Sequence, residues 1–163
     1  TGGYGASAYY LDEQCEGCVV EKNLSIGVVR PSHNHMARNN AIRNNVFVND
    51  GPMQITFPRS SGYTFERNIL CAQGPITLDN FEAVTKLSGN VLFSRQGPIE
   101  CRKLDQYSRT GTYTLEPSEE NPQADPMLTV YEGGKIEFAP DSPARRLGIE
   151  PIDVSDAGPR LRG

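Results

Sequence analysis

The sequence predicts an all-β fold, a right-handed parallel β-helix, because two markers return along the chain with the same period. In the first marker an apolar residue, two free positions and an asparagine precede an apolar-free-apolar run, and in the second a Gly-Pro pair precedes an apolar residue. The asparagines are Asn23, Asn45, Asn68 and Asn90, and the Gly-Pro pairs begin at Gly51, Gly74 and Gly97. The intervals are 22 or 23 residues in both series. A fixed period in this range is typical of a repeat protein.

The residues within each repeat predict strands and turns. Short alternating runs of Val, Ile, Phe, Leu and Thr end at Gly, Pro, Asn or Ser, and such runs are too short for helices. A leucine-rich repeat would need a dense leucine frame, which the mixed apolar residues do not supply. We therefore expect one coil per repeat, with successive coils about 4.8 Å apart.

Two physical properties of asparagine explain why it returns at a fixed position of each coil. It tolerates the left-handed backbone conformation of a sharp turn. Stacked coils also superpose these residues, so that their side-chain amides can hydrogen-bond along the stack. We expect the four asparagines to form one ladder at a corner of the helix.

In chain order, residues 9–12 alternate as a first strand, and each Gly-Pro pair precedes a further strand. We expect β-helix coils over residues 1–110, and the last coil with an irregular C-terminal capping tail over residues 111–163. Together they form one domain, the C-terminal part of a longer β-helix. The first coil presents an open sheet edge, which we expect missing N-terminal coils, another chain or a second copy to cover.

Composition excludes several functions and leaves the cysteines open. The net charge is −4 without a concentrated basic run, so we expect neither a nucleic-acid partner nor an anionic membrane. No apolar run approaches the length of a membrane span. Cys15 and Cys18 fit half a zinc site, a redox pair or two unrelated core residues. Cys71 and Cys101 supply no second paired spacing, so we expect no metal site.

The only histidines, His33 and His35, mark the candidate site. Two residues apart on a strand, they point to one side, and Arg30 and Asn34 make their surroundings polar. Counting back one repeat places Asp12 and Glu13 within one coil of Asn34 and the histidines. An ordinary solvated turn is the alternative interpretation.

Carboxylate pairs of a glycosidase must lie about 5 to 9.5 Å apart. Asp12 and Asp79 are three coils apart, about 14 Å at the spacing of parallel strands, which is too far. Asp12 and Glu13 are consecutive and face opposite sides unless the strand ends there. Asp79 and Glu100 could lie about 7 to 8 Å apart, but Arg102 can neutralise Asp79 as a simple surface ion pair.

Three motifs carry a resemblance to a known family. They are Tyr10-Leu11-Asp12-Glu13, Ala124-Asp125-Pro126 and the run from Phe138 to Gly148, FAPDSPARRLG. With the asparagine repeats, the chain from residue 8 to 158 resembles the C-terminal part of large bacterial β-helix glycoside hydrolases in the pectate-lyase-like superfamily. The resemblance implies polysaccharide degradation by a secreted or periplasmic protein. It also implies that the Asp12 strand and the histidine strand line the sugar cleft.

We therefore expect a carbohydrate-active protein, with glycoside hydrolase as the leading function and plant or algal polysaccharide as the substrate. Asp12 would be the acid/base or nucleophile, and His33 or His35 its partner. The expected substrate-binding residues are Tyr10, Glu13, Arg30, Asn34, Asp79, Glu100 and Arg102. The alternatives are a polysaccharide lyase and a non-catalytic carbohydrate-binding or structural spine. No cofactor is expected, and calcium enters only under the lyase alternative.

Overall fold

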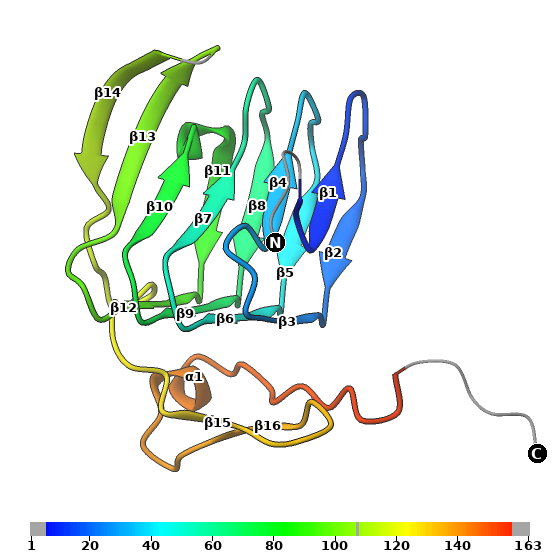
Figure 1. Cartoon of the computed structure of the whole chain (residues 1–163), viewed down its shortest axis with the longest axis vertical. Coiled ribbons are helices and arrows are strands. Elements are labelled where there is room, and N and C mark those ends of the chain that lie inside the picture. The colour runs from blue at the N-terminus through cyan, green and yellow to red at the C-terminus, as the bar shows by residue number, and fades with distance from the viewer. Residues whose placement is uncertain (1–5, 107, 158–163) are drawn as a thin grey trace, which may run out of the picture.

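A computed structural model of the chain describes residues 6–106 and 108–157 and has the predicted fold, a right-handed parallel β-helix (Figure 1). The first sheet contains β1 (Tyr9–Leu11), β4 (Ser32–Asn34), β7 (Met53–Thr56), β10 (Ile76–Asp79), β13 (Glu100–Asp105) and β14 (Ser108–Thr114). The second contains β11 (Val84–Ser88), β8 (Tyr63–Glu66), β5 (Ala41–Arg43) and β2 (Val19–Glu21). The third contains β12 (Val91–Ser94), β9 (Ile69–Ala72), β6 (Val46–Asn49) and β3 (Leu24–Ile26).

Strand register places residues one repeat apart directly above one another. In the first sheet, parallel pairing aligns β1 with β4, β4 with β7, β7 with β10 and β10 with β13. One outward-facing column on this sheet therefore contains Tyr10, His33, Thr56, Asp79 and Arg102. The register thus brings polar residues from five coils onto one face.

The predicted asparagine ladder is confirmed, and it has a fifth member. Oδ1 of Asn45 accepts the backbone N–H and the side-chain N–H of Asn23, at 3.1 and 3.0 Å. The same pair of hydrogen bonds links Asn45 to Asn68, Asn68 to Asn90, and Asn90 to Asn121. The ladder satisfies polar groups that are buried from water from Asn45 to Asn90.

The left-handed residue of this corner is not the ladder asparagine, as we had expected, but the residue before it. Lys22, Asn44 and Arg67 have φ of 55, 53 and 50°, and Gly89 has φ of 69°. The ladder asparagine is therefore selected for its side-chain hydrogen bonds.

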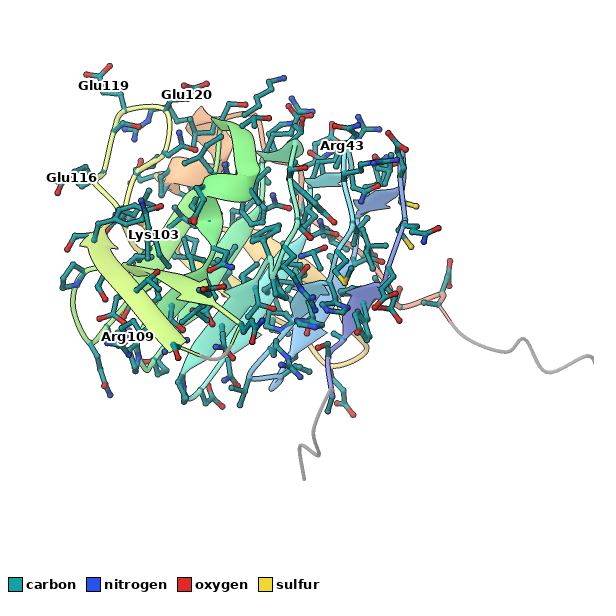
Figure 2. The ribbon with its side chains drawn as sticks, turned by 90° about the horizontal axis from the view of Figure 1, so that it is seen from above. Arg43, Lys103, Arg109, Glu116, Glu119 and Glu120 are labelled. Atoms are coloured by element: carbon teal, nitrogen blue, oxygen red, sulfur yellow. The ribbon has the colours of Figure 1, made fainter. Side chains whose placement is uncertain are left out.

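Aromatic and aliphatic side chains fill the interior between the three sheets. Phe47, Phe57, Phe65 and Tyr63 are fully buried there. Phe81, in the 3-10 helix η1 (Phe81–Ala83), packs edge-on against Phe65 with ring centroids 5.9 Å apart. Charged side chains lie on the outside of the coils, including Arg43, whose Nε is 2.7 Å from Glu21 Oε2 (Figure 2).

The C-terminal residues have two roles: β14 and Asn121 close the end of the stack, and the residues after them cover the third sheet. β14 returns antiparallel to β13, and Asn121 then adds the last step of the ladder. β15 (Leu128–Val130), β16 (Ile136–Phe138) and helix α1 (Pro143–Arg146) lie along the third sheet (Figure 1). Most of the tail therefore covers a lateral face of the helix. No helix among the described residues is long and apolar enough to cross a membrane.

The tail packs on the third sheet because that sheet is apolar on both faces. Val46, Ile69 and Val91 point away from the interior and form one buried cluster with Ile136 and Phe138. Their neighbours Phe47, Leu70 and Leu92 point inward. Consecutive apolar residues in a strand are typical of a sheet covered on both sides.

Replacing Asn68 by Ala should destabilise the protein by about 3 kcal/mol, because it leaves several buried polar groups without partners. Asn68 accepts from Asn45 and donates to the Ile42 carbonyl and to Asn90 Oδ1. Urea unfolding measures the change. Asn23→Ala is the matched control, with an expected loss of about 1 kcal/mol, because Asn23 is only partly buried. Equal losses for the two variants would contradict the role of the ladder.

Candidate functional site

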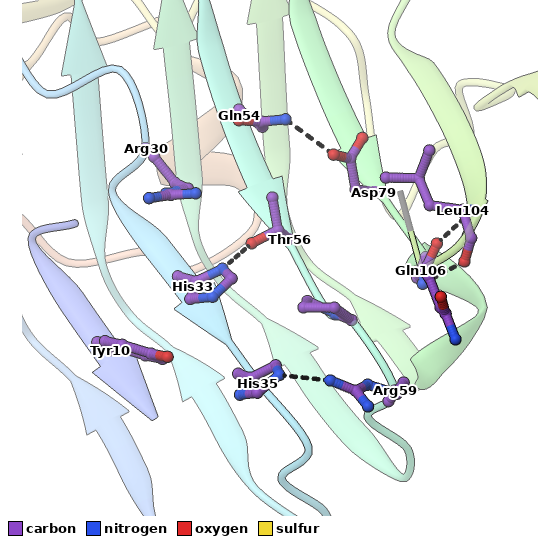
Figure 3. A pocket seen from close by; sticks show the side chains of 12 residues that line it. Tyr10, Arg30, His33, His35, Gln54, Thr56, Arg59, Asp79, Leu104 and Gln106 are labelled. Atoms are coloured by element: carbon purple, nitrogen blue, oxygen red, sulfur yellow. Dashed lines mark hydrogen bonds between the residues drawn. The ribbon is translucent and has the colours of Figure 1, made fainter. Parts of the chain in front are cut away.

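A groove with a volume of about 480 Å³ crosses the outer face of the first sheet (Figure 3). Residues from β1, β4, β7, β10 and β13 and from the segments beside these strands line it. They are Tyr10, Arg30, His33, His35, Gln54, Thr56, Pro58, Arg59, Asp79, Asn80, Leu104 and Gln106. Five of the ten residues expected at the site are not part of this lining, namely Asp12, Glu13, Asn34, Glu100 and Arg102.

The two histidines face the groove together, as predicted. Their rings are nearly parallel, at an interplanar angle of 8°, with centroids 6.1 Å apart. Asn34, between them, is buried and donates to Ser32 Oγ and to the Thr56 carbonyl oxygen. Asn34 therefore supports the strand from its inner side and does not reach the groove.

His35 is held by a hydrogen bond on each ring nitrogen. An N–H of Arg59 lies 3.0 Å from Nε2, and Oδ1 of Asp12 lies 3.2 Å from Nδ1. Since a guanidinium can only donate, Nε2 accepts, and Nδ1 carries the proton that is donated to Asp12. The imidazole of His35 thus links a carboxylate to an arginine.

The carboxylates of Asp12 and Glu13 approach the same nitrogen of His35. Their nearest oxygens lie 3.2 and 4.0 Å from Nδ1, so these oxygens are no more than about 7 Å apart, the sum of the two distances. They converge because β1 ends at Leu11 and the chain turns, with the Cys15 N–H donating to the Asp12 carbonyl at 3.1 Å. The sequence predicted that Asp12 and Glu13 would face opposite sides unless the strand ended there, and the strand does end there.

Asp12 is a stabilised anion at the edge of the site. The backbone N–H of Glu13 and the imidazole of His35 hold the pKa of Asp12 below its usual value. The Tyr10 hydroxyl donates to the same Oδ1 at 3.2 Å. Asp12 is therefore charged at neutral pH, at the rim of the groove beside Tyr10 and His35.

His33 lies deeper in the groove. Its Nδ1 contacts the Thr56 hydroxyl, and its ring centroid is 4.7 Å from that of Tyr10. Burial, followed by the charge of Arg30, lowers the pKa of His33 to about 4. His33 is therefore a neutral imidazole at neutral pH, able to accept or donate one proton.

Asp79 lines the far part of the groove, but both of its oxygens are occupied. Arg102 donates to Oδ1 and Oδ2 at 2.6 and 2.9 Å, and Gln54 donates to Oδ2 at 2.8 Å. The side chain of Asp79 is 6% exposed. Asp79 and Arg102 thus form the neutralised ion pair that the sequence offered as the alternative to a catalytic pair. Glu100 is paired in register with Thr77 and Thr114.

Arg30 and Arg59 bring positive charge to the groove. The Nε of Arg30 donates to Ser7 Oγ of the preceding coil at 3.0 Å. Arg59 was not among the expected residues. A signal for it exists, because it follows His35 by 24 residues and so belongs to the equivalent turn of the next coil.

No cysteine lines this groove. All four cysteines are free thiols, and burial raises the pKa of Cys71 and of Cys101 to about 11. Within residues 6–106 and 108–157, no group of three or more His, Cys, Asp or Glu side chains is placed to hold a metal ion.

No family model, no curated protein and no solved structure matches the chain. The fold and the groove define a class of protein, a β-solenoid with a polar groove across one sheet. Its function rests on the geometry of that groove.

The low pKa of His33 should make stability depend on pH. The unfolded chain protonates this imidazole at its ordinary pKa of 6.5, and the folded protein at about 4. Because the unfolded state binds the proton first, this contribution to stability is complete above pH 6.5 and is lost as the pH falls towards 4. In the His33→Gln variant, the midpoint of urea unfolding should therefore change less with pH between 6.5 and 4 than in the parent protein. A titration midpoint near 6.5 for His33, measured by NMR, would contradict the assignment.

Proposed function

We propose that the protein is carbohydrate-active and that its groove binds plant or algal polysaccharide as the substrate of a glycoside hydrolase. The observation that carries this proposal is the convergence of Asp12 and Glu13 on His35 at one end of the groove. A secreted or periplasmic location is part of the same proposal. Canonical glycoside hydrolysis requires two carboxyl groups on either side of the scissile bond.

The groove has features that suit an oligosaccharide. Arg30, Gln54 and Arg59 supply hydrogen-bond donors along its length, and Tyr10, 47% exposed, supplies an aromatic face beside the carboxylates. Sugar rings combine hydroxyl groups with apolar faces, and such ligands need a few placed polar groups next to an aromatic surface. The groove spans five coils, from Tyr10 to Leu104, so its length is about 19 Å at about 4.8 Å per coil.

The proposed roles follow from the environment of each group. Asp12, with its lowered pKa, is the base or nucleophile. Glu13 is the second carboxyl group that the reaction needs. The upper bound of about 7 Å between their nearest oxygens is compatible with retention, at about 5 to 5.5 Å, and with the lower part of the range for inversion, about 6.5 to 9.5 Å. His35, fixed by Arg59, positions the Asp12 carboxylate.

A polysaccharide lyase is the second candidate, and His33 favours it. A neutral imidazole can remove the proton next to a uronate carboxylate, and Arg30 can neutralise that carboxylate. Calcium would enter only in this case. A non-catalytic binding spine is the remaining candidate.

Asp12→Asn and Glu13→Gln should each lower polysaccharide hydrolysis at least about 100-fold, the usual size of an acid/base contribution. New reducing ends measure hydrolysis, and absorbance of unsaturated products measures elimination. Glu100→Gln is the matched control, because this carboxylate lies outside the groove and should leave the rate unchanged.

Two results would redirect the proposal. Full hydrolysis by both carboxylate variants would remove Asp12 and Glu13 from the mechanism. Unsaturated products that disappear in His33→Ala would identify a lyase, and glycan binding without turnover by the parent chain would identify a binding spine.

A further inference from the structure

A second cleft lies between a corner of the helix and the C-terminal tail. Its volume is about 490 Å³, close to that of the groove. One wall is the corner between the second and third sheets, and the other is the tail segment after helix α1. The lining residues are Lys22, Asn44, Arg67, Gly148, Glu150, Pro151, Ile152 and Asp153. None of them lines the groove, so the two sites are separate.

The helix wall of the cleft is a row of polar side chains held by the asparagine ladder. Lys22, Asn44 and Arg67 each follow a strand of the second sheet, so they repeat about every 4.8 Å along the wall. Each has a positive φ and precedes a ladder asparagine, so the ladder fixes the backbone of the row. The next coil has Gly89 at this position, where a Cβ would lie 3.2 Å from Arg67 Cγ. Gly89 thus leaves room for the stem of Arg67.

This helix wall offers hydrogen-bond donors to a ligand. The Nε of Arg67 donates to Asn44 Oδ1 at 3.0 Å, and its Nη2 donates to Glu66 Oε1 at 3.3 Å. Within residues 6–106 and 108–157, neither Asn44 Nδ2 nor Lys22 Nζ has a partner. An amide and an ammonium are therefore free to donate into the cleft.

The tail wall offers hydrogen-bond acceptors and is anchored on both sides. Ile149 and Ile152 are buried in the cluster between the tail and the third sheet, and each makes a backbone hydrogen bond within the tail. Glu150 and Pro151 lie between these two anchors and are exposed. The proline ring fixes the backbone φ of this short bridge. In the part of the chain that the structure describes, the Glu150 carboxylate has no partner.

The charges of the two walls offset one another. Lys22 and Arg67 on the helix wall are matched in number by Glu150 and Asp153 on the tail wall. Hydrogen bonds from Ser155 lower the pKa of Asp153 and keep it charged. A simple anion or cation would meet its own charge on one wall. A sugar hydroxyl both accepts and donates, so a sugar ring can accept from the helix wall and donate to the tail wall.

We propose that this cleft is a second carbohydrate-binding site, which takes an uncharged stretch of a polysaccharide chain. Sugar hydroxyls accept from Lys22 and Asn44 and donate to Glu150, and the exposed ring of Pro151 lies against the apolar face of a sugar. The choice of polysaccharide as the ligand rests on the proposed function. The cleft and the groove share no residue, so each can be tested without the other.

The position of the cleft gives it a role in retention. The corner that forms its wall joins the second and third sheets, whereas the groove crosses the first sheet. A chain held in the cleft therefore leaves the groove open to another chain. Such a site keeps the protein on an insoluble polysaccharide while the groove binds a neighbouring segment.

Two variants test the cleft with neutral oligosaccharides released from plant and algal cell walls by partial acid hydrolysis. Lys22→Gly removes a donor at a φ of 55°, which glycine adopts without strain. Glu150→Ala removes the facing acceptor. Amide shifts of residues 148–153 in an NMR titration measure the affinity, and each variant should weaken it at least about tenfold, because each loses hydrogen bonds to a charged group.

Three further variants separate the cleft from general effects of charge. Arg146→Ala and Glu132→Ala remove one positive and one negative charge at exposed positions outside the cleft and should leave the affinity unchanged. Gly148→Asn should weaken binding without removing a charge, because it narrows the cleft. A Cβ at Gly148 meets no atom within 4 Å, and asparagine tolerates its φ of 69°.

The proposal is overturned if the oligosaccharides shift no amide of the cleft, or if Lys22→Gly and Glu150→Ala bind them as tightly as the parent. Hydrolysis of a short soluble oligosaccharide should be equal in the parent and in both variants, because the groove alone carries it. A parent that shows the cleft shifts but hydrolyses no polysaccharide would remove the proposed function and leave the second site in place.

Discussion

The in-register stacking of coils is the constraint on which the rest of this structure depends. Parallel strands place each residue above its counterpart one repeat earlier, so any side chain that repeats with the period forms a continuous column. At the corner, each asparagine side chain in the column bonds to the next one. The same side chains also bond to buried backbone N–H and carbonyl groups. On the first sheet, the column from Tyr10 to Arg102 carries different residues in each coil, so that sheet can differ in chemistry along its length.

The repeat made the fold predictable, because the turns between strands vary little in length from Asn23 to Asn90. The ladder residue Asn121 escaped prediction, since the β13–β14 hairpin places it 31 residues after Asn90 and hides the period. The position of the tail was also missed. Its signal lay in β6 and β9, where consecutive apolar residues require cover on both faces of the third sheet.

The site was predictable only where strand geometry sets it. The register brought Asp12 beside His35, and strand alternation brought His33 and His35 to one side. Glu13 and Arg59 lie in turns, where side-chain direction depends on local backbone torsions that alternation does not describe. For Asp79, the sequence offered both a catalytic and a neutralised state, and the facing Arg102 decides between them because a bidentate pair leaves neither oxygen free.

The carboxylates of Asp12 and Glu13 are exposed to water beside β1, the outermost strand of the first sheet. The side chains of Asp12 and Glu13 are 63% and 57% exposed, and water screens the interaction of such groups with a developing charge. His33, in contrast, is half-buried, so its environment already differs from that of bulk water. The acid–base chemistry proposed for Asp12 would therefore require a bound ligand that expels water from the first coil.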